Sequence, residues 1–395
     1  MSTRIGIGFS KGANAQKIAQ EAAAEAKQEF GTDSIDLVMI LSTIHYPPSV
    51  TLPVIADIFG NTRIVGCSTA GILLSDAIEL HGLAVLAIAS DEIKFGIGAA
   101  SHIENDDIDQ AGIALARNCS ADLGIQSRSA FIVFIDSLIK NNSSLLRGIQ
   151  SVFGNVFPII GGGSCDDFRL KDAFEIYRNK FLRRAAVGLL LGGDVAIGIS
   201  GRHGWLPIGK PRIINKTQGN IIKLIDNKYA SSIYEEYLGK NIQQLHSSNL
   251  GQTAILYPLG IKCDGHDEYL LRNAVDIRSD GSILCQGEIP EESEVHMMIG
   301  KKDSCLKAAA KAAEESKKQL SGRRAKLILI IESLTRLKLL GRIASQELRL
   351  IKNTFGPSIP IFGFYANGEI YPFQTIEGVK KPHVLNESIV VLAVG

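Results

Sequence analysis

Three short segments of small and polar residues contain the side chains whose types and spacing could do chemistry. They are residues 64–71 (IVGCSTAG), 159–166 (IIGGGSCD) and 361–368 (IFGFYANG). Small side chains let a ligand approach the main chain, so turns of this composition can expose backbone N–H groups that bind an anion such as a carboxylate. The candidate ligand-binding residues in and around these turns, with two from outside them, are Gly66, Cys67, Ser68, Thr69, Gly161, Ser164, Asp166, Arg272, Tyr365, Asn367 and Glu369.

The charged candidates suit a zwitterion, which needs one anion-binding and one cation-binding element. Arg272 could hold a carboxylate in bidentate fashion, and Asp166 or Glu369 could face an ammonium group. Each has a plainer alternative. Arg272 could be a surface residue paired with Asp276 or Asp280, and Glu369 could be an exposed turn acid.

Cys67 separates a binding protein from an enzyme. As a thiolate among N–H donors it would be a nucleophile, whereas a free cysteine is usually a small buried hydrophobe. A nucleophile needs a base, and His45 and His81 are the nearest histidines in sequence. The equivalent positions of the other turns hold Gly162 and Phe364, which favours binding without turnover. The alternative is a cysteine-dependent enzyme that acts on a small amide or acyl substrate through Cys67.

Other chemistry has weaker signals. The segment 263–267 offers one pair of metal ligands without a second pair at zinc spacing, and the glycines at 6, 8 and 12 lack the dinucleotide spacing. We therefore expect no metal and no cofactor. A formal net charge of +1 gives no global electrostatic case for nucleic acid or membrane binding.

The elements that position these turns repeat along the chain. A helical pattern, an apolar strand, a second helix and a buried strand precede each turn, at 37–42, 131–136 and 327–332 for the apolar strands. Strand, helix, strand successions predict parallel pairs, whereas 82–89 with 93–99 and 273–278 with 282–286 resemble antiparallel hairpins. The sequence thus predicts an α/β protein with mixed sheets flanked by helices, built from a repeated helix-strand-helix-strand-hairpin unit. A four-layer packing of sheet on sheet is an open alternative.

The chain divides at its only tryptophan. Trp205 begins a Pro- and Gly-punctuated segment, which predicts a first module at 1–205, a linker at 206–219 and a second module at 220–395. The six dispersed cysteines favour a reducing compartment, and the N-terminus lacks the apolar run of a secretory signal. We therefore expect a cytoplasmic protein without membrane insertion.

Four ordered motifs resemble the FIST sensory family, with its N-terminal and C-terminal modules. They are VGCSTAG at 65–71, GGG followed by Asp166-Asp167, GWLPIG at 204–209 and GFYANGEI at 363–370. The resemblance implies a domain that detects a small molecule, with amino acids the suggested ligand class, and passes a signal to a histidine kinase, cyclase-type or chemotaxis-type output. We expect a stand-alone protein whose output partner acts in trans. Residues 332–336 (ESLTR) depart from the small, Cys- and Gly-containing segment expected there.

Overall fold

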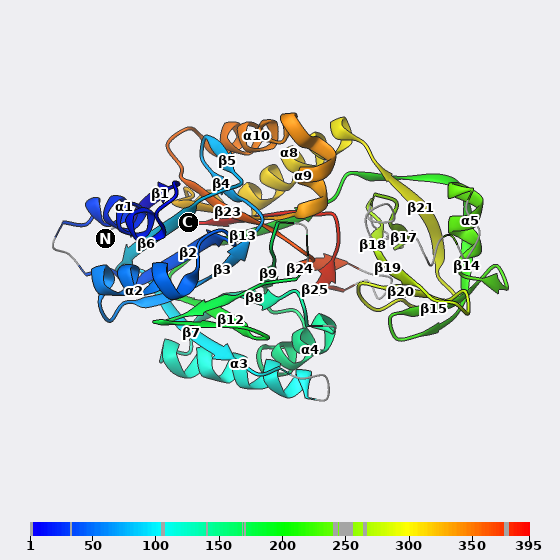
Figure 1. Cartoon of the computed structure of the whole chain (residues 1–395), viewed down its shortest axis with the longest axis horizontal. Helices are drawn as coiled ribbons and strands as arrows, with labels where there is room; N and C mark the ends of the chain where they lie inside the picture. The colour runs from blue at the N-terminus through cyan, green and yellow to red at the C-terminus, as the bar shows by residue number, and fades with distance from the viewer. Residues whose placement is uncertain are drawn as a thin grey trace.

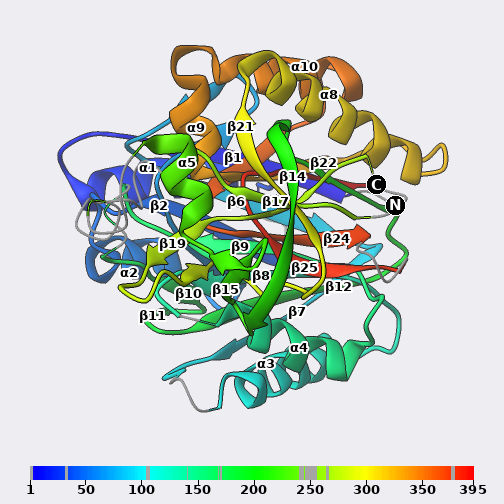
Figure 2. The same ribbon diagram turned by 90° about the vertical axis from the view of Figure 1, so that its right-hand side faces the viewer.

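The computed structural model describes residues 3–31, 34–103, 107–139, 141–167, 169, 171–239, 244, 256–263, 267–374 and 379–395. Three six-stranded sheets surround a common apolar core, and an eight-stranded sheet lies across one end of this body (Figures 1 and 2). Helices cover the outer faces of the three sheets (Figure 1). The predicted fold class, α/β modules with mixed sheets flanked by helices, is confirmed.

The body consists of three units with the same element order. The first unit contains β1 (Thr3–Ser10), α1 (Ala15–Gln28), β2 (Leu37–Thr43), α2 (Pro48–Phe59), β3 (Arg63–Thr69), β4 (Ile72–Leu74), β5 (Ala77–Glu79) and β6 (Leu83–Ser90). The second contains β7 (Ile93–Ala100), α3 (Ile108–Leu123), β8 (Arg128–Asp136), α4 (Asn142–Phe153), β9 (Ile159–Ser164), β10 (Glu175–Tyr177), β11 (Lys180–Leu182) and β12 (Ala186–Gly193).

The third unit is interrupted after its first strand. It contains β13 (Ile197–Arg202), α8 (Lys302–Gln319), β22 (Leu327–Ser333), α9 (Leu334–Leu340), the 3₁₀ helix η1 (Gly341–Ile343), α10 (Ser345–Phe355), β23 (Ile361–Ala366), β24 (Glu369–Gln374), β25 (Lys380–Leu385) and β26 (Ile389–Val394). The insertion supplies the eight-stranded sheet and is called the inserted domain below. It contains β14 (Trp205–Gln218), β15 (Ile221–Ile225), β16 (Lys228–Tyr229), α5 (Ser232–Leu238), β17 (Leu259–Ile261), β18 (Leu270–Arg272), β19 (Ala274–Ile277), β20 (Ile283–Cys285) and β21 (Glu294–Gly300).

Each unit gives a hairpin to the sheet of another unit. The sheet orders are β1-β6-β2-β3-β10-β11, β7-β12-β8-β9-β24-β25 and β13-β26-β22-β23-β4-β5. The hairpin of the first unit therefore extends the third sheet, that of the third extends the second sheet, and that of the second extends the first. This cyclic exchange ties the three units together through main-chain hydrogen bonds.

Helix packing depends on small residues at the contact. In α1, the side-chain oxygen of Asn14 accepts a hydrogen bond from Lys17 N at 3.0 Å and so caps the helix. The buried face of α1 is rich in alanine, and a Cβ added to Gly8 of β1 would lie 2.0 Å from the carbonyl oxygen of Ala22. Only glycine in the strand permits so close an approach of helix to sheet.

Trp205 joins the inserted domain to the third unit. It is buried with Leu271 and Met298 of the inserted domain and with Cys305 and Leu340 of α8 and α9. Its large side chain therefore anchors the start of β14 against both parts of the protein.

Several local predictions are wrong. Residues 82–89 and 93–99 are strands but do not pair, because β6 pairs with β1 and β2 whereas β7 pairs with β12. The three small-residue segments are mostly strand, since β3, β9 and β23 run through them. The segment 206–219 is largely β14. The four-layer packing of sheet on sheet, which was an open alternative, is not found, because three sheets surround one core. The hairpin at 273–286 is confirmed by the pairing of β19 with β20. The division into modules at 205 and 220 stays a prediction.

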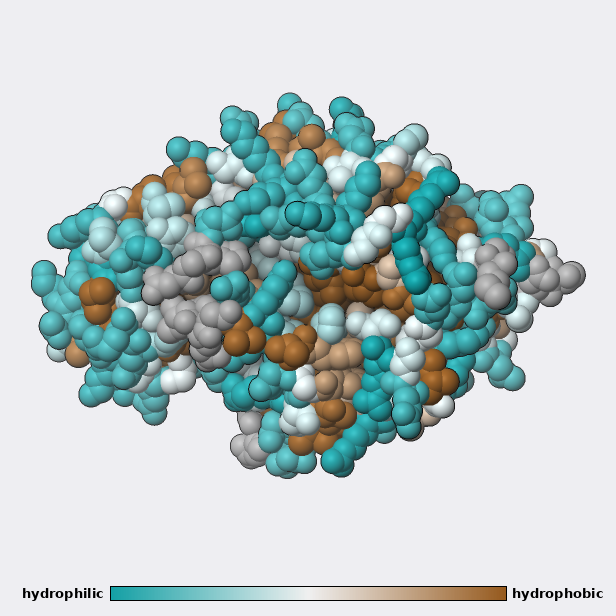
Figure 3. All heavy atoms as spheres, turned by 180° about the vertical axis from the view of Figure 1, so that it is seen from behind, coloured by the Kyte–Doolittle hydropathy of each residue, from teal (hydrophilic) through white to brown (hydrophobic). Residues whose placement is uncertain are grey.

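The reverse face of the molecule is mainly hydrophilic (Figure 3). A band of hydrophobic residues crosses its middle. Among the described residues no helix is long and apolar enough to cross a membrane.

Candidate functional site

A cluster of buried polar side chains lies where the strand ends of the third unit meet the inserted domain. We call it the polar junction. Its members come from β22, α9, α10, β23, β24, the turn before β26 and the edge of the inserted domain: Glu332, Arg336, Glu347, Tyr365, Glu369, Asn386, Glu387, Arg272 and Asn273. All are buried. Charged groups are seldom buried to this extent unless they are paired or bind something.

Arg336 is the hub of the junction. Its guanidinium forms an ion pair with Glu347 and lies 3.4 Å, Nε to Oε1, from Glu332. It also donates hydrogen bonds to the carbonyl oxygens of His203 and Cys305, the latter at 3.1 Å. One side chain therefore links β22, α8, α10 and the entry to the inserted domain. Burial raises the pKa of Glu332, and the neighbouring Glu347 raises it further.

Two further carboxyl groups have no cation paired with them in the described part of the chain. Glu369 Oε2 accepts a hydrogen bond from Ser388 N at 2.9 Å, but its Oε1 has no hydrogen-bond partner among the described residues. Neither carboxyl oxygen of Glu387 has such a partner within those residues. Burial raises the pKa of Glu369 well above its usual value and that of Glu387 to about 8. Near neutral pH Glu387 therefore holds a proton for much of the time.

Arg272 is a buried cation without a carboxylate partner in the described ranges. Its Nε donates to Glu288 O at 2.9 Å, and its Nη1 donates to Leu271 O at 3.0 Å and Val384 O at 3.1 Å. Burial lowers its pKa to about 10. The alternative of a surface arginine paired with an aspartate is therefore wrong.

The inserted domain brings residues 272–273 beside the segment that leads to Glu387. Asn273 N donates to the side-chain oxygen of Asn386 at 3.3 Å, so residues 272–273 run along residues 384–387. The side-chain oxygen of Asn273, the side-chain nitrogen of Asn386 and the hydroxyl of Tyr365 are buried without a hydrogen-bond partner among the described residues. Buried polar atoms in native proteins nearly always have partners, so this concentration needs an explanation.

The candidates in the first small-residue segment lie inside β3 rather than in an open turn. Gly66, Cys67, Ser68 and Thr69 pair with β2 on one side, and Gly66 and Cys67 pair with β10 on the other. Ser68 N also donates to Phe174 O at 2.8 Å. The expected free N–H donors are therefore partly engaged in sheet hydrogen bonds, because this segment continues the strand.

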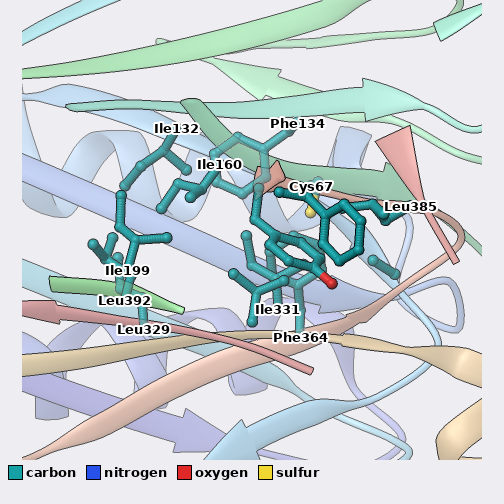
Figure 4. Packing of buried hydrophobic residues seen from close by; sticks show 14 of the residues in the cluster. Cys67, Ile132, Phe134, Ile160, Ile199, Leu329, Ile331, Phe364, Leu385 and Leu392 are labelled. Carbon is teal, nitrogen blue, oxygen red and sulfur yellow. The ribbon is translucent and has the colours of Figure 1, made fainter. Parts of the chain in front are cut away.

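Cys67 is fully buried in the central core. Its sulfur lies among apolar side chains that include Phe134 and Phe364 (Figure 4). Burial raises the pKa of the thiol well above its usual value, and the nearby Glu175 raises it further. The candidate histidine bases, His45 and His81, instead contact each other, with ring centroids 4.0 Å apart and ring planes tilted by 53°.

The second small-residue segment belongs to a separate polar group. Ser164 donates a hydrogen bond to Glu175, which is fully buried and pairs with Cys67 across the β10–β3 ladder. Asp166 accepts hydrogen bonds from Lys171 N at 2.8 Å and Asp172 N at 3.2 Å. Gly161 lies in β9, opposite Ile370 of β24.

The third segment reaches the polar junction. The hydroxyl of Tyr365 is buried there, whereas Asn367 N donates to Gly163 O at 3.0 Å in the turn between β23 and β24. The structure thus brings Arg272, Tyr365 and Glu369 to one region and leaves the candidates of the first segment in β3. Sequence reasoning missed Arg336, Glu347, Glu387 and Asn273 because none belongs to a local motif.

Small cavities lie elsewhere, along the axis of the central core. Two cavities of about 20 and 10 Å³ are lined almost wholly by aliphatic and aromatic side chains such as Met39, Ile132 and Leu329. They offer little that could orient a zwitterion. Within the described residues no group of three or more His, Cys, Asp and Glu side chains could hold a metal ion. Asp264–His266, part of the weak metal-ligand segment, lie outside the described residues.

The chain matches two domains of one family. Residues 36–228 match the FIST N domain, and residues 230–372 match the FIST C domain. An uncharacterized protein of Mycobacterium tuberculosis is 23% identical over 388 residues, which cover 93% of this chain and 95% of that protein. An uncharacterized protein of Methanocaldococcus jannaschii is 26% identical over 188 residues, which span 45% of this chain and only 35% of that protein.

Among solved structures the chain is similar to cyanuric acid hydrolases. The enzyme from A. caulinodans has a TM-score of 0.37 and 8% identity, with 99% of both chains covered. A second cyanuric acid hydrolase has a TM-score of 0.38 and 9% identity over the whole of both chains. Likeness at this level supports no inference about this chain.

Proposed function

Because the chain belongs to the FIST family, whose domains are sensory, signal-transduction domains that bind small ligands, we propose that it senses an amino acid or a related carboxylate and signals in trans to a separate output protein. The output is a histidine kinase, a cyclase-type or a chemotaxis-type protein, and the setting is the cytoplasm. The ligand is bound reversibly and is not turned over.

One observation carries this proposal. Unpartnered buried polar atoms of Tyr365, Glu369, Glu387, Asn273 and Asn386 are concentrated at the polar junction. Leaving such atoms without partners costs about 1–3 kcal/mol each, so a ligand that bonds to them recovers a large free energy. A second body of the protein, the inserted domain, covers these atoms and can respond to what binds between it and the strand ends.

The charges at the junction suit a zwitterion. Arg272 is a buried guanidinium without an anionic partner in the described ranges, and it supplies the element that reads the carboxylate. Glu369 supplies the element that reads the ammonium, because one of its oxygens is free of hydrogen bonds to described residues.

The enzyme alternative has less support. A nucleophilic cysteine needs a lowered pKa and access to substrate, whereas Cys67 is fully buried and has a raised pKa. The family match also favours a sensory role.

A binding screen tests the proposal. Amino acids are screened by thermal shift and the best ligand is titrated by calorimetry, since a ligand at about 100 times its Kd stabilises a protein by about 2.7 kcal/mol. Two analogues of that ligand are then compared, one with its carboxylate amidated and one with its amine removed. Arg272→Ala should weaken the parent ligand by about 2–5 kcal/mol but hardly weaken the amide further, and Glu369→Gln should behave likewise with the deaminated acid.

Glu175→Gln is the matched control. Glu175 is as deeply buried as Glu369 but bonds to Ser164 away from Arg272, so its substitution should leave the ligand's Kd unchanged. If Arg272→Ala and Glu369→Gln weaken both analogues equally, these residues act on folding and do not read the ligand. A chemically altered ligand in mass spectrometry would favour the enzyme.

A further inference from the structure

Carboxyl groups outnumber guanidinium groups in the polar junction. It contains four carboxyl groups, those of Glu332, Glu347, Glu369 and Glu387, and two guanidinium groups, those of Arg336 and Arg272. Both ion pairs of Arg336 go to Glu332 and Glu347. Glu369 and Glu387 are therefore left without a paired cation in the described part of the chain.

These two carboxyl groups also have more acceptor capacity than one ammonium group needs. Three of their four oxygens have no hydrogen-bond partner among the described residues: Glu369 Oε1 and both oxygens of Glu387. The free oxygens of Asn273 and Tyr365 lie in the same cluster. The free donors of the cluster include Asn386 Nδ2 and Arg336 Nε, and the free acceptors outnumber them. An ammonium group has three donors and cannot accept, so a region with this excess of acceptors suits a cation.

We propose, building on the amino-acid sensor above, that the ligand carries a second cationic group and belongs to the basic amino acids, with its two cationic groups held by Glu369 and Glu387 and its carboxylate by Arg272. A ligand with one ammonium group would leave one of the two carboxyl groups buried and unpaired. A second cationic group gives each carboxyl group a partner, as buried charges require.

Binding of such a ligand should release protons. Arg336 from α9 is the cation that faces both Glu387 and Glu369, and the carboxyl group of Glu387 faces Glu369. The other titratable neighbours are Cys305 of α8 beside Glu387, and Cys165 and Tyr371 beside Glu369. The polar neighbours are Asn273, Thr335, Ser333 and Ser388. In the ligand-free protein burial keeps a proton on Glu387 near pH 7, since its pKa is about 8. A cation placed against this carboxyl group lowers its pKa, so the proton leaves when the ligand binds.

Calorimetric titrations with three probes test the inference. Lysine carries both amines and the carboxylate, norleucine has the same side-chain carbons without the second amine, and cadaverine has both amines without the carboxylate. Ornithine tests a shorter side chain, and arginine tests a guanidinium in place of the side-chain amine. At least one basic amino acid should bind 30-fold or more tightly than norleucine, and its binding at pH 7 should release protons, measured as a dependence of the apparent enthalpy on the buffer's ionisation enthalpy.

Variants assign the effect to the two carboxyl groups. Glu387→Gln should bring the affinity for the basic amino acid close to that for norleucine and should abolish most of the proton release. Glu175→Gln, a buried substitution in the second unit, should change neither. If Glu387→Gln does not fold, the unaltered protein still tests the inference, because the dependence of its apparent binding enthalpy on the buffer shows whether binding releases protons.

The outcomes separate this inference from the proposed function. If norleucine or another neutral amino acid binds as tightly as every basic one, or if binding releases no proton, the inference is overturned while the amino-acid sensor stands. If cadaverine binds and no amino acid does, the second cationic group is supported and the amino-acid sensor is overturned. If none of the probes and no other amino acid binds, both fail.

Discussion

The hairpins of the second and third units place glutamates at equivalent positions with different surroundings. Glu175 opens β10 and pairs with Cys67 of β3, and Glu369 opens β24 and pairs with Gly162 of β9. Both are fully buried with raised pKa values. Glu175, however, accepts a hydrogen bond from Ser164, whereas Glu369 lies in a cluster with several unpartnered polar atoms beside the inserted domain.

The first unit completes the comparison. Its hairpin has Ile72 at this position, opposite Phe364 of β23, and the site is apolar. One backbone position therefore carries an apolar contact, a buried glutamate bonded to a serine hydroxyl of its own unit, and a buried glutamate at the polar junction. Each glutamate has one carboxyl oxygen without a hydrogen-bond partner among the described residues. The three units therefore share the same strand ends. In the third unit alone the inserted domain packs beside this position, and there the strand ends form a candidate site.

Removing the hub should have the largest effect. Arg336→Ala leaves Glu332 and Glu347 buried without a cation, so we expect a loss of about 3–5 kcal/mol in the free energy of unfolding. Urea denaturation measures it. Arg349→Ala, on the exposed face of α10, should cost under about 0.5 kcal/mol. A loss below 1 kcal/mol for Arg336→Ala would show that the junction tolerates unpaired charge.

The stability of the junction should fall as pH rises. Glu387 titrates near its ordinary pKa when unfolded and at about 8 when folded, so the folded state binds more protons between about pH 4.5 and 8. The free energy of unfolding should therefore decrease across that range, by up to about 1.4 kcal/mol per pH unit for this group.

Substitution isolates this contribution. Glu387→Gln cannot ionise, so its stability relative to the parent protein should rise between pH 5 and 8. Glu314→Gln, an exposed change on α8, should give a difference that is independent of pH. If the free energy of unfolding depends on pH in the same way for the parent protein and for Glu387→Gln, Glu387 is ionised across the whole range from pH 5 to 8.

The turn into β24 gives a smaller effect. Gly368 has φ +87°, and a Cβ there would lie 2.7 Å from the side-chain nitrogen of Gln286 in the inserted domain. Gly368→Ala should cost about 1–2 kcal/mol and also weaken ligand binding. Gly124→Ala has a similar φ of +69° with open space around it, so it should cost about 1 kcal/mol and leave binding unchanged. If Gly368→Ala and Gly124→Ala change the ligand's Kd equally, the turn into β24 is not part of the binding site.

Cys67 should show the smallest effect. Because the thiol is buried and its pKa is raised, iodoacetamide at neutral pH should label it no faster than the other five cysteines, all of which are buried. Mass spectrometry of tryptic peptides measures the rates, with urea-unfolded protein as the reference. Selective labelling of Cys67 would instead favour the nucleophile.

Much of the fold could be predicted because strands and helices have local patterns. The apolar runs at β2, β8 and β22 and the alanine-rich face of α1 identified their elements. Strand partners could not be predicted in the same way. A run such as 83–90 indicates a strand, but its pairing with β1 and β2 instead of the adjacent 93–100 depends on how three sheets close around one core.

The same limit applies to the site. Arg272 and Glu369 were found because their charges suit a zwitterion, and Tyr365 because it lies in the third small-residue segment. Arg336 belongs to a segment, 332–336, that sequence reasoning treated only as unusual, and Glu347 and Glu387 belong to no motif. These residues belong to the site only because β22, α10, the turn before β26 and the inserted domain come into contact. Such contacts cannot be predicted from residue spacing along the chain.

The cyclic exchange of hairpins also sets an order for folding during synthesis. The first sheet needs no residue beyond Leu182, so it can be complete while the ribosome is still translating the inserted domain. The second sheet must wait for β25 and the third for β26 at the C-terminus, where Phe364 pairs with Ile72 almost three hundred positions earlier. Contacts so distant in sequence form slowly, and until then the edges of β9 and β4 are open to wrong partners. The nascent chain is therefore most exposed to aggregation before β23 to β26 have left the ribosome and paired.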